Sequence, residues 1–176
     1  MTDEELFRQY REGNVLAFED LYGRYRQSLY LYLLGSVPTQ SEAEELYQET
    51  WSRVIHARES FTEGSFRAWL FHIARNLRID SFRRQRLQLV DDPPEEDLSN
   101  PGRSSEEQVD AADCGERLKL ELQRLPEEQR EVFLLKEESG LTLEQIGDML
   151  GLGRETMKSR MRYALKRLRQ MLEDCL

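Results

Sequence analysis

Residues 141–172 constrain the fold most, because they carry the pattern of a helix-turn-helix. Thr142 with Gln145 three residues later is a capping box, which marks the first turn of a helix. Gly151 suits the positive-φ position that ends such a helix, and Gly147 is small where two helices would cross. We therefore expect a short helix, a tight turn and a longer second helix.

The second helix of this motif separates into an apolar stripe and a basic face when its side chains are placed at about 100° per residue. The stripe consists of Met157, Met161, Ala164, Leu165, Leu168 and Leu172. Residues 154–169 contain seven basic residues and one acidic residue. A basic helix after such a turn is typical of recognition helices that enter the DNA major groove. A solvated helix face without a ligand is the alternative interpretation.

The net charge of −9 is unusual for a DNA-binding protein until it is divided along the chain. Residues 1–90 hold 12 basic and 13 acidic groups, and residues 114–176 hold 12 of each. Residues 91–113 hold one basic and nine acidic groups, so nearly all of the excess lies in this short segment. Local patches therefore decide electrostatic binding more than the total charge does.

The first 86 residues have the pattern of four helices. Apolar residues spaced at threes and fours predict helices at about 3–12, 15–35, 41–58 and 66–86. Ser41 with Glu44 fits a capping box at the start of the third helix. In the fourth, aromatic residues alternate with arginines, which suits contact with unstacked bases. The alternative is a helix buried on two sides that ends in a solvated basic tail.

Residues 87–108 are expected to form a flexible acidic linker, because acids, prolines, serine and glycine dominate the segment. An acidic interaction tail, or a segment that competes with DNA for the basic faces, are alternatives. Helices at about 109–125 and 126–139 precede the helix-turn-helix, with Leu118, Leu120, Leu122 and Leu125 as apolar positions. The predicted fold class is all-α, with helical domains at 1–86 and 109–176.

Several classes of function lack support in the sequence. We expect no membrane insertion, since no apolar run approaches the roughly 20 residues of a membrane span, and the acidic N-terminus is no signal peptide. His56 and His72 are the two histidines, and no cluster has metal-ligand spacing. There is no phosphate-binding glycine loop and no nucleophile motif. We expect no enzyme, no cofactor and no metal.

Five segments in order resemble the small bacterial RNA polymerase sigma factors of the extracytoplasmic-function (ECF) group, in the sigma-70 family. They are AFEDLYGRY (17–25), AEELYQETW (43–51), FRAWLFHIARNLRIDSFRRQR (66–86), LPEEQREVFLLKEESGLTLEQIGDMLG (125–151) and ETMKSRMRYALKRLR (155–169). The resemblance implies a sigma-2-like and a sigma-4-like helical domain. It also implies a cytoplasmic bacterial protein that binds core RNA polymerase at the β′ clamp and β flap, and an anti-sigma factor that can hold it at the membrane.

The resemblance also implies three sets of site residues. Core polymerase would contact Glu45, Gln48, Glu49 and Arg53 on the third helix. The −10 element would contact a specificity loop and the fourth helix through Arg58, Phe61, Thr62, Glu63, Ser65, Arg75, Asn76, Arg78, Arg83 and Arg84. The −35 element would contact Arg154, Thr156, Lys158, Ser159, Arg160, Arg162, Tyr163 and Lys166.

The expected function is promoter-specific transcription initiation through −35 duplex binding and −10 base capture and melting. One alternative is a helix-turn-helix regulator whose N-terminal helices serve as a dimerisation or sensing module, which a dimer on palindromic half-sites would favour. A second alternative is a protein-interaction adaptor whose basic helix binds an acidic partner.

Overall fold

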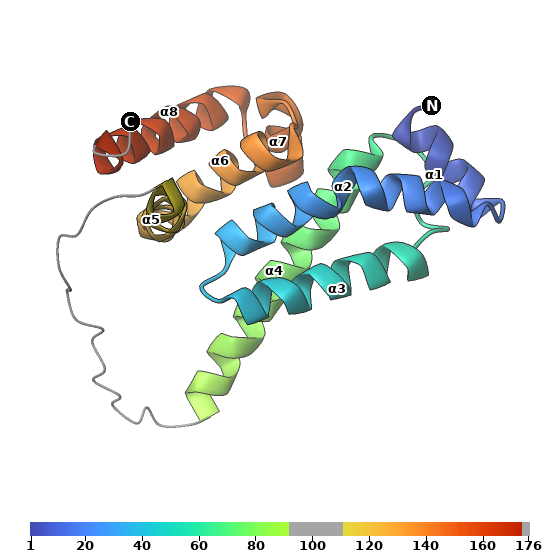
Figure 1. Cartoon of the computed structure of the whole chain (residues 1–176), viewed down its shortest axis with the longest axis horizontal. Helices are drawn as coiled ribbons and strands as arrows, with labels where there is room; N and C mark the ends of the chain where they lie inside the picture. Colours follow the sequence, from blue (N-terminus) through green and yellow to red (C-terminus); the bar gives the residue numbers. More distant parts are fainter. Residues whose placement is uncertain (92–110, 174–176) are drawn as a thin grey trace.

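The computed structural model describes residues 1–91 and 111–173, and this part of the chain consists of eight helices without a strand (Figure 1). The predicted all-α class is therefore confirmed. The N-terminal helices are α1 (Asp3–Arg11), α2 (Val15–Ser36), α3 (Gln40–His56) and α4 (Phe66–Asp91). The C-terminal helices are α5 (Ala111–Arg124), α6 (Glu127–Ser139), α7 (Leu143–Leu150) and α8 (Arg154–Met171).

Two predicted helix ends are wrong. Helix α3 starts earlier than expected, since Thr39 and Glu42 form its capping box and not Ser41 and Glu44. Helix α4 continues past residue 86 to Asp91, because no helix-breaking residue occurs before Pro93. The expected linker therefore begins as helix, and its remaining residues, 92–108, lie outside the described residues.

The N-terminal helices enclose a core rich in aromatic rings. Phe7 of α1 is fully buried, and its ring centroid lies 5.4 Å from Phe61, 4.9 Å from Phe66 and 5.4 Å from Trp69. Face-to-edge and tilted arrangements of this kind add to the free energy of burial. This cluster joins α1, the α3–α4 loop and the start of α4 into one unit.

The helix-turn-helix forms as its local signals predict. The Thr142 side chain accepts a hydrogen bond from the Gln145 backbone, and the Gln145 side chain accepts one from the Thr142 backbone. Gly151 ends α7 with φ of 68°. A Cβ atom added to Gly147 would lie 2.6 Å from the backbone oxygen of Leu152, so the close approach requires glycine.

The predicted apolar stripe of α8 faces the other C-terminal helices. Met157, Ala164 and Leu168 are buried, Met161 and Leu172 are partly buried against the same core, and Leu165 is half-buried. The prediction for α5 is only half right, because Leu118 and Leu120 are exposed although Leu122 and Leu125 are buried.

The two halves of the chain pack against each other along α2 and α6. Figure 1 shows α2 between α6 on one side and α3 and α4 on the other. Leu134 of α6 lies against Gly35 of α2, where an added Cβ would be 2.7 Å from Leu134 Cδ2. Gln123 of α5 donates hydrogen bonds to the carbonyls of Gly35 and Val37, at 3.0 and 3.1 Å. One hydrophobic core therefore spans both halves.

Candidate nucleic-acid interface

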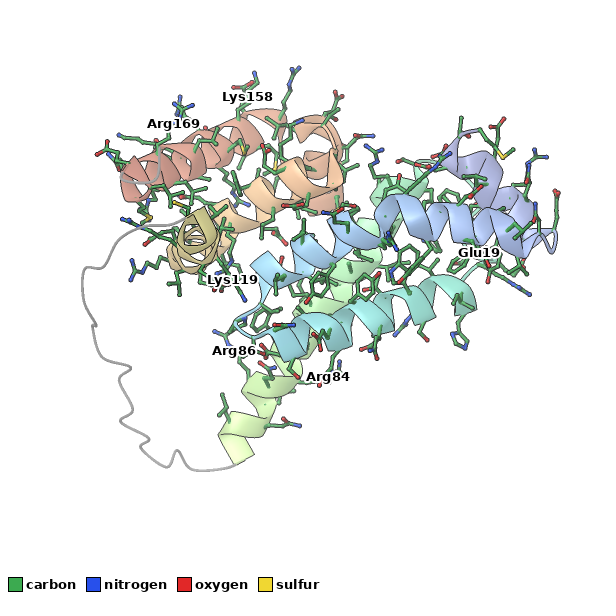
Figure 2. All side chains as sticks on the ribbon, viewed as in Figure 1. Glu19, Arg84, Arg86, Lys119, Lys158 and Arg169 are labelled. Atoms are coloured by element: carbon green, nitrogen blue, oxygen red, sulfur yellow. The ribbon has the colours of Figure 1, made fainter. Side chains whose placement is uncertain are left out.

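Helix α8 presents a basic face that no other described helix covers. Arg154, Thr156, Lys158, Arg162, Tyr163 and Lys166 are exposed on it. Figure 2 shows Lys158 and Arg169 on the outer side of α8, away from α6. The turn between α7 and α8 and the apolar stripe of α8 hold the helix against the other C-terminal helices. Its basic face is therefore fixed in position and open to a DNA groove.

Neighbouring groups orient several side chains of that face. The Arg162 guanidinium lies 5.3 Å from the centroid of the Tyr163 ring, within the range of a cation–π contact. Glu155 accepts a hydrogen bond from Lys158 at 2.8 Å, and this contact lowers the pKa of the Glu155 carboxyl. Arg160 is half-buried and forms an ion pair with Glu128 of α6 at 3.1 Å. Of the predicted −35 residues, Arg160 is thus engaged within the protein, and Ser159 is half-buried.

The outer face of α3 carries the residues predicted to contact core polymerase. Glu45, Gln48 and Arg53 are exposed, and Glu49 is half-buried. Arg53 lies 3.9 Å from Glu49, one helical turn away. The opposite face is anchored by buried apolar residues that include Leu46, Trp51 and Val54. The face is therefore polar, accessible and firmly supported, which a protein-binding surface requires.

Phe61 does not have the exposure that a base-stacking residue needs. Only 7% of its surface is accessible, and its ring packs in the aromatic cluster around Phe7. Its carbonyl accepts a hydrogen bond from Arg11 Nη1 at 2.9 Å. The expectation of direct base contact by Phe61 is therefore corrected: in this structure the ring anchors the loop.

The rest of the α3–α4 loop divides into exposed and structural positions. Arg58, Thr62 and Glu63 are exposed. Ser65, by contrast, accepts a hydrogen bond from the backbone of Ala68 at 3.2 Å and so caps α4. The Ser65 hydroxyl therefore has a structural role at the start of α4. Thr62 and Glu63 remain as accessible polar groups at the tip of the loop.

The predicted DNA-contacting residues of α4 fall into two groups. Asn76, Arg83 and Arg84 are exposed. Arg75 and Arg78 instead point at Glu131 of α6, with Nε and Nη2 at 2.7 Å from the same carboxylate oxygen. In this conformation neither guanidinium is open to a phosphate. Much of helix α4 is thus buried, as the second interpretation of its sequence expected, and its final turns are solvated.

Sequence reasoning missed the residues that organise these surfaces from a distance. On α1, Arg11 holds the loop, and the Glu4 side chain accepts a hydrogen bond from the Phe66 backbone at 3.0 Å. On α6, Glu127 and Glu131 bind the α4 arginines. Nothing local marks these residues, since each pairs with a partner about 50 residues away or more.

The described residues offer no support for a metal or membrane-embedded site. Among them, no group of three or more histidine, cysteine, aspartate or glutamate side chains is placed to hold a metal ion. None of the helices in the described ranges combines the length and apolarity of a membrane span.

Comparison with known proteins agrees with this arrangement. The family model for Sigma-70 region 2 matches residues 21–88, and that for Sigma-70, region 4 matches residues 122–170. The chain is 34% identical to the ECF RNA polymerase sigma factor RpoE of Cereibacter sphaeroides, covering 88% of this chain and 85% of that protein. It is 30% identical to the RNA polymerase sigma factor CarQ of Myxococcus xanthus, covering 94% and 95%.

Solved structures show the same fold. The sigma factor RpoE of Bartonella quintana, in complex with the anti-sigma factor NepR, aligns with a TM-score of 0.71 at 26% identity, covering 89% of this chain and 96% of that one. CnrH, in complex with the cytosolic domain of CnrY, aligns with a TM-score of 0.70 at 24% identity, covering 98% and 97%. With both regions matched in order and a relative at 34% identity over most of its length, the chain belongs to the ECF group of sigma-70 family RNA polymerase sigma factors.

Proposed function

We propose that this protein binds core RNA polymerase through the outer face of α3 and directs it to promoters. In this proposal, α8 contacts the −35 duplex, and the α3–α4 loop with the exposed part of α4 contacts the −10 element. The observation that carries the proposal is the pairing of two accessible faces, polar on α3 and basic on α8, on separate halves of one chain. A regulator that dimerises through its N-terminal helices would not require a polar α3 face.

A comparison of free energies indicates that the polymerase supplies most of the energy for DNA melting. Separating DNA strands costs about 1.4 kcal/mol of stacking per base-pair step. Capturing one unstacked base returns roughly 1–3 kcal/mol. One captured base offsets only a step or two, so the loop nucleates opening and the polymerase sustains it. The accessible groups for this capture are Thr62, Glu63 and Asn76, together with the phosphate-guiding Arg83 and Arg84.

The partners in this proposal are the β′ clamp and β flap of core polymerase, promoter DNA and an anti-sigma factor. The complex of the Bartonella quintana relative with NepR supports a regulator of that class. An anti-sigma factor anchored in the membrane would hold this otherwise cytoplasmic protein there. The functional units are an N-terminal domain of residues 1–86, whose last helix extends to Asp91, and a C-terminal domain of residues 109–176.

Removing the polar groups of α3 tests the polymerase contact. The double substitution Glu49→Ala with Arg53→Ala should weaken binding to core polymerase roughly tenfold or more, because arginine is enriched among the hot spots of protein interfaces and Glu49 lies beside it. Titration of labelled protein with core polymerase measures the effect. Glu19→Ala, which removes an exposed carboxylate from α2, is the matched control and should bind normally. Full affinity of the double variant would remove α3 from the polymerase interface.

Replacing Arg162 tests the −35 contact. Arg162→Ala should lower binding to a −35 duplex, selected from random sequence with the wild-type holoenzyme, by about 1–3 kcal/mol and relax the preference at one base pair. Arg169→Ala removes the same charge from the same helix and should weaken all sequences more evenly. Equal base preference in the two variants would show that Arg162 contacts only phosphate.

A further inference from the structure

A recess between α4 and α6 has a strongly basic lining. It encloses about 480 Å³ and is lined by Ile79, Phe82, Arg83 and Arg86 of α4 and by Glu127 and Arg130 of α6. The residues of α4 follow the i, i+3, i+4, i+7 spacing of one helix face, so they border the same space. The recess thus combines three arginines with a single carboxylate.

The one carboxylate of this lining is already engaged. Glu127 Oε1 accepts a hydrogen bond from Arg78 Nη1 at 3.2 Å. Within residues 1–91 and 111–173, none of Arg83, Arg86 and Arg130 forms an ion pair. In the described part of the chain, the positive charge of these three guanidinium groups therefore has no anionic partner.

Arg130 is the most enclosed of the three arginines. It is half-buried, whereas Arg83 and Arg86, which is labelled in Figure 2, are exposed. Its Nη1 donates to the backbone carbonyl and to the side-chain oxygen of Gln123, at 3.3 and 3.0 Å, and both acceptors are uncharged. Burial, and then the nearby charge of Arg78, lower the pKa of Arg130. An anion in the recess would offset both effects.

Three guanidinium groups around one recess suit the chemistry of phosphate. Arginine binds a phosphate through a planar fork of N–H donors. One phosphoryl group carries a charge of about −1.5 to −2 near pH 7, which leaves part of three positive charges unbalanced. A diphosphate supplies a second phosphoryl group and therefore matches the lining better. The volume of the recess also lies within the roughly 300–1,000 Å³ of small-molecule pockets.

We propose that this recess binds the diphosphate group of a small molecule through Arg83, Arg86 and Arg130. Ile79 and the half-buried Phe82 form the apolar part of the lining, against which a nucleoside can pack. The diphosphate thus belongs either to a nucleoside diphosphate or to inorganic pyrophosphate. Because the guanidinium groups come from two helices, the bound ligand bridges α4 and α6 and stabilises their contact.

Binding of this ligand goes beyond the proposed function and does not depend on it. Arg83 is also assigned to the −10 DNA in that proposal, so a bound diphosphate and a DNA phosphate would compete for its guanidinium group. Arg130, on the α6 side of the recess, has no such assignment. A compact ligand suits the recess better than a DNA strand does, because Arg130 is half-buried between two helices.

Isothermal titration calorimetry of the full chain with inorganic pyrophosphate tests the site in the absence of polymerase and promoter DNA. We expect one pyrophosphate per chain, and a midpoint of thermal unfolding that rises with ligand concentration. Arg86→Gln, at an exposed position, and Arg130→Gln should each weaken binding about tenfold or more. Arg26→Gln removes the same charge from an exposed position of α2 outside the recess and is the matched control.

Absence of binding by pyrophosphate, ADP and GDP at millimolar concentration would overturn the proposal. An equal loss of affinity in Arg26→Gln and Arg86→Gln would also overturn it, since it would indicate nonspecific attraction between charges. Inorganic phosphate that binds as tightly as pyrophosphate would contradict the diphosphate assignment. Tighter binding of ADP or GDP than of pyrophosphate, lost in Phe82→Leu, would identify a nucleotide. Equal or weaker nucleotide binding would identify inorganic pyrophosphate, and either of these two results supports the diphosphate site.

Discussion

Phe7→Ala is expected to destabilise the N-terminal half of the protein by about 3–5 kcal/mol, the range for removing a large aromatic ring from a packed core. The Phe7 ring is fully buried and contacts Phe61, Phe66 and Trp69 from three different directions. No small rearrangement refills that volume, since the surrounding rings belong to a loop and to another helix. Chemical denaturation followed by tryptophan fluorescence measures the loss, because Trp69 lies beside the cavity.

Two further variants distinguish the effect of a cavity on the free energy of unfolding from the effect of losing any apolar side chain. Phe7→Leu keeps much of the volume and should cost clearly less than Phe7→Ala. Leu16→Ala removes an exposed apolar side chain of α2 and should change the free energy of unfolding by no more than about 0.5 kcal/mol. A loss below 1 kcal/mol for Phe7→Ala would show that α1 is not part of the cooperative core.

The same substitution connects the core to function. The α3–α4 loop is held by the Phe61 ring against Phe7 and by the Arg11 bond to the Phe61 carbonyl. Loss of the Phe7 ring therefore releases the loop as well as α1. Helix α1 precedes the residues that match the Sigma-70 region 2 model, yet it supports the loop of that region.

The helix-turn-helix could be predicted from sequence because its determinants are local. Thr142, Gln145 and Gly151 act within a few residues of one another, and each behaves as expected. The stripe of α8 follows from helical periodicity alone, and its residues Met157, Ala164 and Leu168 are buried. The exposed polar face of α3 follows for the same reason, although its first turn begins two residues before the expected capping box.

The positions of Phe61, Arg75 and Arg78 could not be predicted, because distant segments determine them. An aromatic residue in a loop and arginines on a helix have the pattern of DNA contacts whether or not another element covers them. Here α1 covers Phe61, and α6 covers both arginines. The sequence of α6 contains Glu127 and Glu131, but periodicity does not indicate that they face α4 across the two halves.

Gly147→Ala and Gly23→Ala are expected to change stability in opposite directions, although both replace a glycine inside a helix. At Gly23 of α2 no atom outside the neighbouring backbone lies within 4 Å of an added Cβ, so alanine should stabilise by about 0.5–1 kcal/mol. At Gly147 the Cβ would lie 2.6 Å from the Leu152 carbonyl oxygen and 3.4 Å from Met157. The turn would have to open, at a cost of about 1–3 kcal/mol.

Gly147→Ala should also affect the two binding activities of the protein differently. Opening that turn moves α8 relative to α7, since the Leu152 amide donates to the Gly147 carbonyl at 2.9 Å and closes the turn. Gly147→Ala should therefore lose −35 duplex binding while it retains affinity for core polymerase through α3. Thermal unfolding and the two binding titrations measure both effects. Stabilisation by both alanines would mean that α7 and α8 do not cross as closely as the geometry requires, and the basic face of α8 would then lose its rigid support.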